Sequence, residues 1–230
     1  MHDLQNSVKF LEIPTTDLKA FELGVNIATT AGKVIFRNEL MELIYYTPTQ
    51  NQNYQIPILI TPPWINKYYI LDLTEKKSMV KWLLEMGYSV FMISWINPDN
   101  TLAHKDFEDY MLEGPVQAIK FIREKFKVQT VSAIGYCIGG TLLASTLAYL
   151  AKKSLKYVSA AVFFTTLLDF SDAGDISAFL DEEMIDKIEL QMDKLGYFDG
   201  KDLAATFSML RANEMIWNFF INNYLLGKSN

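Results

Sequence analysis

The only cysteine of the chain, Cys137, lies in the run Gly-Tyr-Cys-Ile-Gly-Gly at residues 135–140. A Gly-x-Cys-x-Gly pattern between a strand and a helix is typical of a nucleophile elbow, and Gly135 and Gly139 leave room for its sharp turn. The N-terminus of the following helix would stabilise a thiolate. We therefore interpret Cys137 as a catalytic nucleophile; the alternative for a lone cysteine between glycines is a small buried side chain.

An elbow nucleophile needs backbone N–H groups that stabilise an oxyanion, one from the next residue and one from the loop after an earlier strand. Ile138 occupies the first position. For the second, the run Thr-Pro-Pro-Trp-Ile-Asn at 61–66 follows a predicted strand, and Ile65 is our candidate. The alternative is a rigid turn with an aromatic plug. The same loop offers Trp64 and Asn66 as candidate substrate-binding residues.

A base for the thiol is harder to find, because the two histidines, His2 and His104, both precede Cys137. In folds that use this elbow, the acid and the histidine follow the nucleophile in the chain. His104 lies in a hydrophilic loop, where a solvated surface role is the better interpretation. Three later aspartates could orient a histidine but fit turn and helix-cap roles better: Asp169, Asp172 and Asp175.

Strands and helices that alternate from about residue 54 must position these groups, and this alternation is typical of a parallel sheet with crossover helices. Helical spacing predicts one helix starting near Thr74 and others at 116–126 and 138–153. We expect the first strand to pair with an earlier apolar run at 40–47. At most four parallel strands are expected, which would leave the last one with an open edge. The predicted strands are 54–61, 88–95, 128–136 and 157–166.

Composition excludes several classes of protein. Half of the 230 residues are hydrophobic, so the chain can bury a core, and the net charge of −6 argues against a nucleic-acid partner. The start of the chain lacks a basic segment followed by an apolar one, and the longest nearly apolar stretch, 157–168, is too short to span a membrane. We expect a cytoplasmic protein without a membrane span, disulfide, metal site or cofactor.

Six stretches, in a fixed order, extend the elbow into a family pattern: FELGVNIATTAGKVIFRNELMELIYY (21–46), TPPWINKYYILDL (61–73), VFMISWINPD (90–99), GYCIGGTLLAS (135–145), FFTTLLDFSDAGDI (163–176) and NEMIWNFFINNYLLGK (213–228). On these residues the chain resembles the poly(3-hydroxyalkanoate) synthases, especially classes I and II. The resemblance implies an α/β fold: a partial α/β-hydrolase core with a lipase-like box, a mostly parallel sheet and crossover helices, followed by helical cap segments. It divides the chain into the end of the family's N-terminal region with a leading β-hairpin strand (1–53), the first part of the core with the elbow (54–170), and a cap segment (171–230).

The resemblance also implies an acyltransferase that polymerises (R)-3-hydroxyacyl-coenzyme A into polyester and releases coenzyme A, which is a substrate rather than a cofactor. Cys137 would carry the growing chain, and the N–H groups of Ile65 and Ile138 would form the oxyanion hole. A histidine would deprotonate the thiol, with an aspartate serving that histidine or the substrate hydroxyl. In the family these two residues follow the cap, so we expect this chain to stop before them and to be inactive alone.

Several alternatives stay open. The missing groups could come from a complementing C-terminal synthase chain, and a homodimer is a further partner to consider. The chain could instead be a non-catalytic remnant or binding module on polyester granules or on an intact synthase. A thiol hydrolase of the dienelactone type is a third interpretation, but it too needs a later histidine. Basic side chains that could meet the anionic coenzyme A, if they are not simply solvated, are Lys67, Lys76, Lys77 and Arg211.

Overall fold

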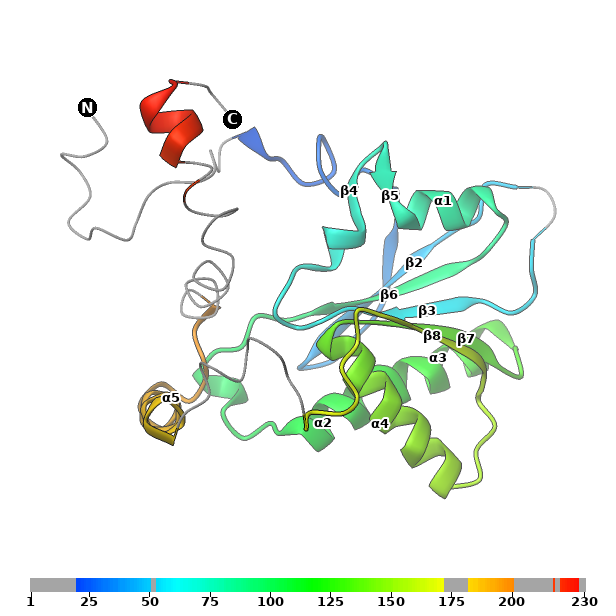
Figure 1. Cartoon of the computed structure of the whole chain (residues 1–230). Helices are drawn as coiled ribbons and strands as arrows, with labels where there is room; N and C mark the ends of the chain where they lie inside the picture. Colours follow the sequence, from blue (N-terminus) through cyan, green and yellow to red (C-terminus); the bar gives the residue numbers. More distant parts are fainter. Residues whose placement is uncertain (1–19, 51–52, 172–181, 201–216, 218–219, 228–230) are drawn as a thin grey trace.

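The computed structural model describes residues 20–50, 53–171, 182–200, 217 and 220–227. Its centre is a six-stranded sheet with helices on both faces: α1 lies on one face, and α2, α3 and α4 lie on the other (Figure 1). The strands follow the order β1-β2-β6-β3-β7-β8 across the sheet. Their bounds are β1 (Lys33–Arg37), β2 (Met41–Tyr46), β3 (Ile58–Thr61), β6 (Val90–Trp95), β7 (Val131–Tyr136) and β8 (Val158–Phe164).

The remaining elements are short connections and helices. A small hairpin follows the loop after β3, and short 3-10 or π-helical segments lie between or after the longer elements. Their bounds are β4 (Asp72–Thr74), β5 (Lys77–Ser78), α1 (Met79–Glu85), α2 (Phe107–Met111), α3 (Gln117–Phe126), α4 (Ile138–Lys152), α5 (Glu182–Leu195), η3 (Tyr68–Leu71), η4 (Asn100–Leu102), η5 (Leu112–Val116) and η8 (Phe220–Leu225). Among the described residues, no helix is both long and apolar enough to cross a membrane.

The sheet is mostly parallel, as predicted, because β6, β3, β7 and β8 run in one direction and β1 and β2 form an antiparallel pair at one side. The expected pairing of the run at 40–47 with the strand after it is wrong. β2 pairs instead with β6, with Leu43 opposite Ile93, so β6 lies between β2 and β3. The connection between β2 and β3 is longer than a tight hairpin loop, and it therefore leaves space for a third strand between them.

Side chains alternate along the strands and form one apolar core on each face. In β6, for example, Phe91 and Ile93 face the helices α2, α3 and α4, whereas Val90 and Met92 face α1. On the α1 face, the buried helix residues are Val80, Leu83 and Leu84. On the other face, buried residues of α3 and α4 include Ala118, Ile119, Ile122, Leu142 and Leu150.

Helix α1 begins at Met79 and not near Thr74, which lies in β4. Ser78 is its N-cap: the Ser78 hydroxyl accepts a hydrogen bond from the Lys81 N–H at 2.9 Å. The same hydroxyl donates to the buried carboxylate of Asp72 at 2.5 Å, so a tertiary contact keeps the preceding residues extended. The prediction of a helix start near Thr74 is therefore wrong, because this contact moves the cap to Ser78.

The segment after β8 is helical where it is described, in α5 and η8, and the rest of the predicted cap lies outside the described residues. The C-terminal end of α5 approaches η4, since a Cβ on Gly196 would lie 2.9 Å from the Ala103 side chain. In Figure 1 the helix accordingly lies beside the loop that leads to α2.

Candidate active site

The candidate nucleophile lies at the junction of β7 and α4, the strand-turn-helix context that its sequence motif predicts. Cys137 has φ 55° and ψ −130°, a conformation that non-glycine residues rarely adopt and that costs about 1–3 kcal/mol. Its N–H donates to the carbonyl of Phe164 at 2.9 Å, and its own carbonyl accepts from Gly140 N–H at 2.8 Å. A mostly parallel sheet with helices on both faces and such an elbow is the architecture of an α/β-hydrolase core, here a partial one, which confirms the predicted fold class.

Three glycines allow the elbow to pack against its neighbours. A Cβ on Gly139 would lie 2.4 Å from the carbonyl oxygen of Thr61, and a Cβ on Gly140 would lie 2.0 Å from the Thr166 hydroxyl. A Cβ on Gly135 would lie 2.5 Å from the Cα of Gly140. The first turn of α4 therefore touches the ends of both β3 and β8, and no side chain larger than hydrogen fits at these contacts.

The loop after β3 is held beside this turn by aromatic side chains. The indole N–H of Trp95 donates to the carbonyl of Pro62 at 2.8 Å, in a buried position. Trp64 is half-buried, and its ring lies 5.4 Å from that of Tyr110 and 6.3 Å from those of Trp95 and Phe107. These contacts order the loop that carries the second candidate oxyanion donor.

The two candidate donors have no recorded acceptor inside the described part of the chain. Ile138 is the first residue of α4, where a helical N–H has no intrahelical partner. Ile65 is half-buried outside any helix or strand, and its N–H makes no recorded hydrogen bond. The structure places the loop of Ile65 against the elbow through the contact at Gly139, and it leaves Asn66 exposed.

No described side chain serves as a base for the thiol. His104 is exposed between η4 and α2, and within the described residues no histidine or carboxylate is hydrogen-bonded to Cys137. Asp169 accepts a hydrogen bond from the Ser171 N–H at 2.9 Å, and this turn contact lowers the pKa of the Asp169 carboxyl. Lys67 donates to the Asn97 side chain at 2.5 Å. Four residues named as candidates from the sequence lie outside the described part: His2, Asp172, Asp175 and Arg211.

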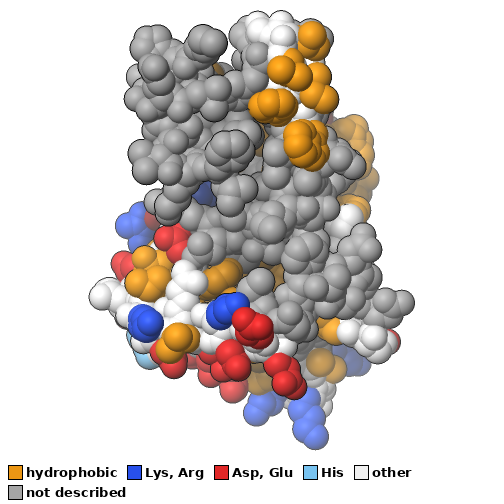
Figure 2. Space-filling view, turned by 60° about the vertical axis from the view of Figure 1, so that its left-hand side comes forward, with side chains coloured by type: hydrophobic (Ala, Val, Ile, Leu, Met, Phe, Trp, Pro, Cys, Tyr) orange, Lys and Arg blue, Asp and Glu red, His pale blue; other side chains and the backbone are white. Residues whose placement is uncertain are grey.

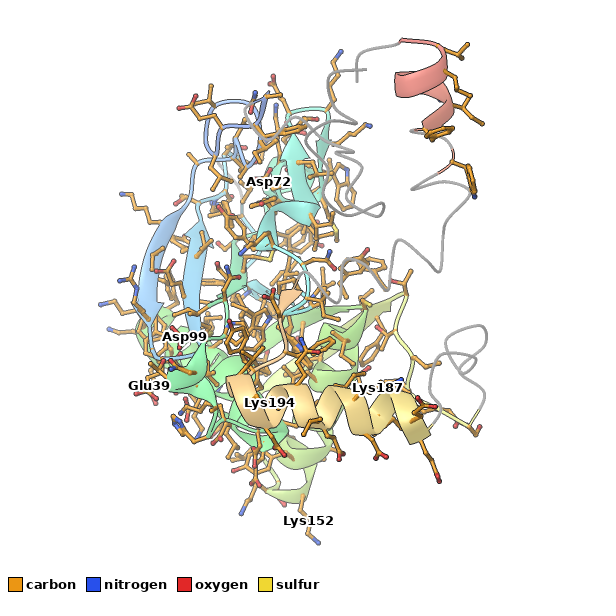
Figure 3. All side chains as sticks on the ribbon, turned by 90° about the vertical axis from the view of Figure 1, so that its left-hand side faces the viewer. Glu39, Asp72, Asp99, Lys152, Lys187 and Lys194 are labelled. Carbon is orange, nitrogen blue, oxygen red and sulfur yellow. The ribbon has the colours of Figure 1, made fainter. Side chains whose placement is uncertain are left out.

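Two buried side chains with structural roles were not singled out from the sequence. Trp95 ends the strand beside β3, and because the carboxyl ends of parallel strands share one edge, its position could have indicated a contact with the loop. Asp72 is fully buried and accepts hydrogen bonds from Thr30 at 2.6 Å and from Ser78. In Figure 3 it lies where the chain before β1 meets the β4–β5 hairpin. No local pattern marks this aspartate, since one of its two partners, Thr30, lies far away in the chain.

Comparisons with known proteins agree with the sequence motifs. Residues 1–83 match the family described as "Poly-beta-hydroxybutyrate polymerase (PhaC) N-terminus". The chain is 48% identical over 227 residues to a poly(3-hydroxyalkanoate) polymerase of Methylorubrum extorquens, covering 99% of this chain and 38% of that protein. It is 38% identical over 226 residues to the poly(3-hydroxyalkanoate) polymerase subunit PhaC of Cupriavidus necator, covering 95% of this chain and 38% of that protein.

Among solved structures, a fungal esterase chain from Rhizomucor miehei is similar at 15% identity with a TM-score of 0.49, over 78% of this chain and 62% of the esterase chain. The sequence relatives are much more similar, and they confirm the resemblance drawn from the motifs. By its sequence, the chain is similar to poly(3-hydroxyalkanoate) polymerases over nearly its whole length, and it spans just over a third of the length of the relatives it matches.

Proposed function

We propose that this chain carries the nucleophile and the oxyanion donors of a polyhydroxyalkanoate synthase, an acyltransferase that polymerises (R)-3-hydroxyacyl-coenzyme A. The observation that supports it most is the strained backbone of Cys137 between β7 and α4, in a turn whose Gly139 contacts the start of the loop that carries Ile65. A strained nucleophile persists only where its surroundings enforce the conformation, as at catalytic elbows. The relatives named poly(3-hydroxyalkanoate) polymerases supply the substrate class.

In the proposed reaction, Sγ of Cys137 attacks the thioester carbonyl carbon as a thiolate. Negative charge develops on the carbonyl oxygen, which the N–H groups of Ile138 and Ile65 stabilise. The bond from carbon to the coenzyme A sulfur then breaks, coenzyme A leaves and takes up a proton, and the acyl group stays on Cys137 as a thioester. The hydroxyl oxygen of the next hydroxyacyl unit then attacks the carbonyl carbon of this thioester while the base takes up the hydroxyl proton. The bond from that carbon to Sγ breaks, the ester bond of the polymer forms, and Cys137 leaves as a thiolate.

This chemistry needs a base that accepts the thiol proton and the hydroxyl proton. The sequence has only His2 and His104, both before the elbow, and His104 is exposed. We therefore propose that a later histidine and aspartate, from the part of a synthase that follows the matched region, complete the site. Because the members of such a site act together, loss of the base alone lowers the rate by roughly 10⁴-fold or more. A cytoplasmic location at the surface of polyester granules belongs to the same proposal.

The test measures coenzyme A release from 3-hydroxybutyryl-coenzyme A by the chain alone and after mixing with the C-terminal part of the Methylorubrum extorquens polymerase. We expect sustained release only from the mixture, together with a mass increase on Cys137. Cys137→Ala must abolish both signals. Turnover by the chain alone that is lost in His104→Ala would contradict the proposal that the base comes from elsewhere.

A second candidate function is a non-catalytic module that binds polyester granules. It is favoured by exposed hydrophobic side chains that gather over η8, at the opposite end of the molecule from most of the charged side chains in the same view (Figure 2). These residues are Trp217, Ile221, Leu225 and Leu226. Co-sedimentation with granules, with no acylation of Cys137 in the mixture, would support this function over the synthase.

A further inference from the structure

The loop after β3 is held between two elements at the carbonyl group of Pro62. On one side, this oxygen accepts a hydrogen bond from the indole N–H of Trp95 at 2.8 Å, and Trp95 is only 8% exposed. On the other side, it lies 2.6 Å from the place that a Cβ on Gly139 would take. One peptide group therefore connects the end of β6 with the first turn of α4, which begins next to Cys137.

A short and stiff stretch of chain leads from this carbonyl to the candidate oxyanion donor. Only two residues lie between Pro62 and Ile65, and the first is Pro63, whose ring fixes φ. The second, Trp64, meets the ring of Trp95 edge-on, with 6.3 Å between the ring centroids. Trp95 therefore contacts the loop on both sides of Pro63, and few free torsions remain between these contacts and the N–H of Ile65.

The indole of Trp95 is fixed at its other end, the six-membered ring, by a glycine. Gly114 lies at the kink of η5 between α2 and α3, and a Cβ there would lie 2.5 Å from Cη2 of Trp95. The ring of Tyr110 in α2 packs on the same indole, with 5.4 Å between the centroids. In a close-packed core, a side chain at 114 would therefore have to displace the indole and turn its N–H away from the loop.

We propose that Trp95 is a positioning residue: it holds the N–H of Ile65 where this group stabilises the oxyanion that forms when Cys137 attacks a carbonyl carbon. The proposal rests on the proposed function, in which that N–H is an oxyanion donor. Such a donor acts at about 2.7–3.1 Å from the oxyanion, and its removal lowers the rate by roughly 10²–10³-fold. A donor that is displaced rather than removed should cost less, about tenfold.

Two reactions of the same thiol separate this role from a purely structural one. With p-nitrophenyl acetate, the thiolate of Cys137 attacks the ester carbonyl carbon and an oxyanion forms. The bond from that carbon to the phenol oxygen then breaks, p-nitrophenolate leaves with the electron pair, and the acetyl group stays on Sγ. With iodoacetamide, the thiolate displaces iodide from a saturated carbon, so that no oxyanion forms. Only the first reaction depends on the N–H of Ile65.

Both rates are measured on the whole chain at about pH 9, above the ordinary thiol pKa of about 8.5, so that no base is needed. Cys137→Ala gives the background. Trp95→Phe keeps a ring in the core and removes the indole N–H, and we expect acylation to slow by about tenfold while alkylation changes by less than about twofold.

Two further variants accompany this one. Gly114→Ala pushes on the same indole and should give the same pattern, which keeps the test valid if Trp95→Phe does not fold. Tyr110→Phe is the matched control, because its ring packs against Trp95 and its hydroxyl donates no hydrogen bond within the described residues. Both rates should be unchanged in this variant.

Ile65→Pro removes the donor itself and shows whether Trp95 acts through it. In this background Trp95→Phe should slow acylation by less than about twofold, since residues that act through one group are not additive. A full tenfold effect in this background would overturn the proposal. An equal loss of acylation and alkylation in Trp95→Phe would do the same, as would a parent chain that is alkylated but not acylated.

The same chain separates this proposal from the proposed function. If Trp95→Phe and Gly114→Ala slow acylation alone, but the parent chain releases no coenzyme A in the mixture with the C-terminal part of the polymerase, the positioning role stands and the proposed function is contradicted.

Discussion

Strands β6 and β8 are both apolar, both parallel to β3, and differ almost completely in burial. Of the six residues of β6, five are buried, and Phe91, Met92 and Ile93 have no exposed surface. None of the seven residues of β8 is buried. The difference comes from position, because β6 has a strand on each side and helices on both faces, whereas β8 has one described neighbour. An apolar run thus indicates that neighbouring strands and helices must cover a strand, and the fold determines whether the described chain provides those neighbours.

The elbow lies between these two regions. Cys137 follows β7, its N–H is bound by the end of β8, and the first turn of α4 touches the end of β3. The side toward β3 belongs to the well-packed part of the core, and the side toward β8 belongs to the exposed part. We therefore expect substitutions in the buried middle of β6 to lower stability strongly and those in β8 to lower it little.

The largest expected effect sharpens this contrast. Phe91→Ala should lower the free energy of unfolding by about 3–5 kcal/mol, since it leaves a cavity in the core. Phe163→Ala should cost about 1 kcal/mol or less in the chain alone, because its ring is partly exposed. Urea denaturation measures both values. Equal losses would contradict the difference in cover.

The next largest effect concerns the buried carboxylate of Asp72. Asp72→Ala should cost about 2–3 kcal/mol, because it leaves the hydroxyls of Thr30 and Ser78 without their acceptor. Asp99→Ala is a matched control: Asp99 also accepts from a threonine hydroxyl, that of Thr101, but in an exposed position. Thermal unfolding should show a clear decrease for the first variant and a much smaller one for the second.

At the elbow, Gly139→Ala should lower stability by about 1–3 kcal/mol, since the new Cβ would overlap the carbonyl oxygens of Thr61 and Pro62. It should also displace the loop of Ile65 and reduce acylation of Cys137 in the mixture with the C-terminal chain. Gly200→Ala, which has open space around the added atom, serves as control. Unchanged stability and acylation would contradict the close contact between α4 and the end of β3.

The smallest effect concerns a buried hydroxyl beside the elbow. Thr61 has no exposed surface, and its hydroxyl has no hydrogen-bond partner. Thr61→Val should therefore change stability by less than about 1 kcal/mol and in the favourable direction. Thr146→Val removes a buried hydroxyl that donates to the Leu142 carbonyl at 2.9 Å, and it should destabilise by about 1 kcal/mol. The same sign for both variants in urea denaturation would indicate that Thr61 has a partner in solution.

Local patterns predicted much of this architecture. The apolar runs identified β3, β6, β7 and β8, and the glycines around Cys137 identified the elbow and its helix. The partner of β2 and the start of α1 could not be predicted in this way. The first depends on which strand occupies the middle of the sheet, and the second depends on the contact between Ser78 and Asp72.

The sequence by itself determined the resemblance to the polymerases, the parallel sheet and the position of the candidate nucleophile, because motifs, glycine spacing and apolar runs are local properties. Only the tertiary structure decided that Trp95 holds the loop of Ile65, that Asp72 is a buried anchor, and which faces of β8 remain exposed. Each of these depends on residues far apart in the chain, and their contacts form only when the strands take their order in the sheet.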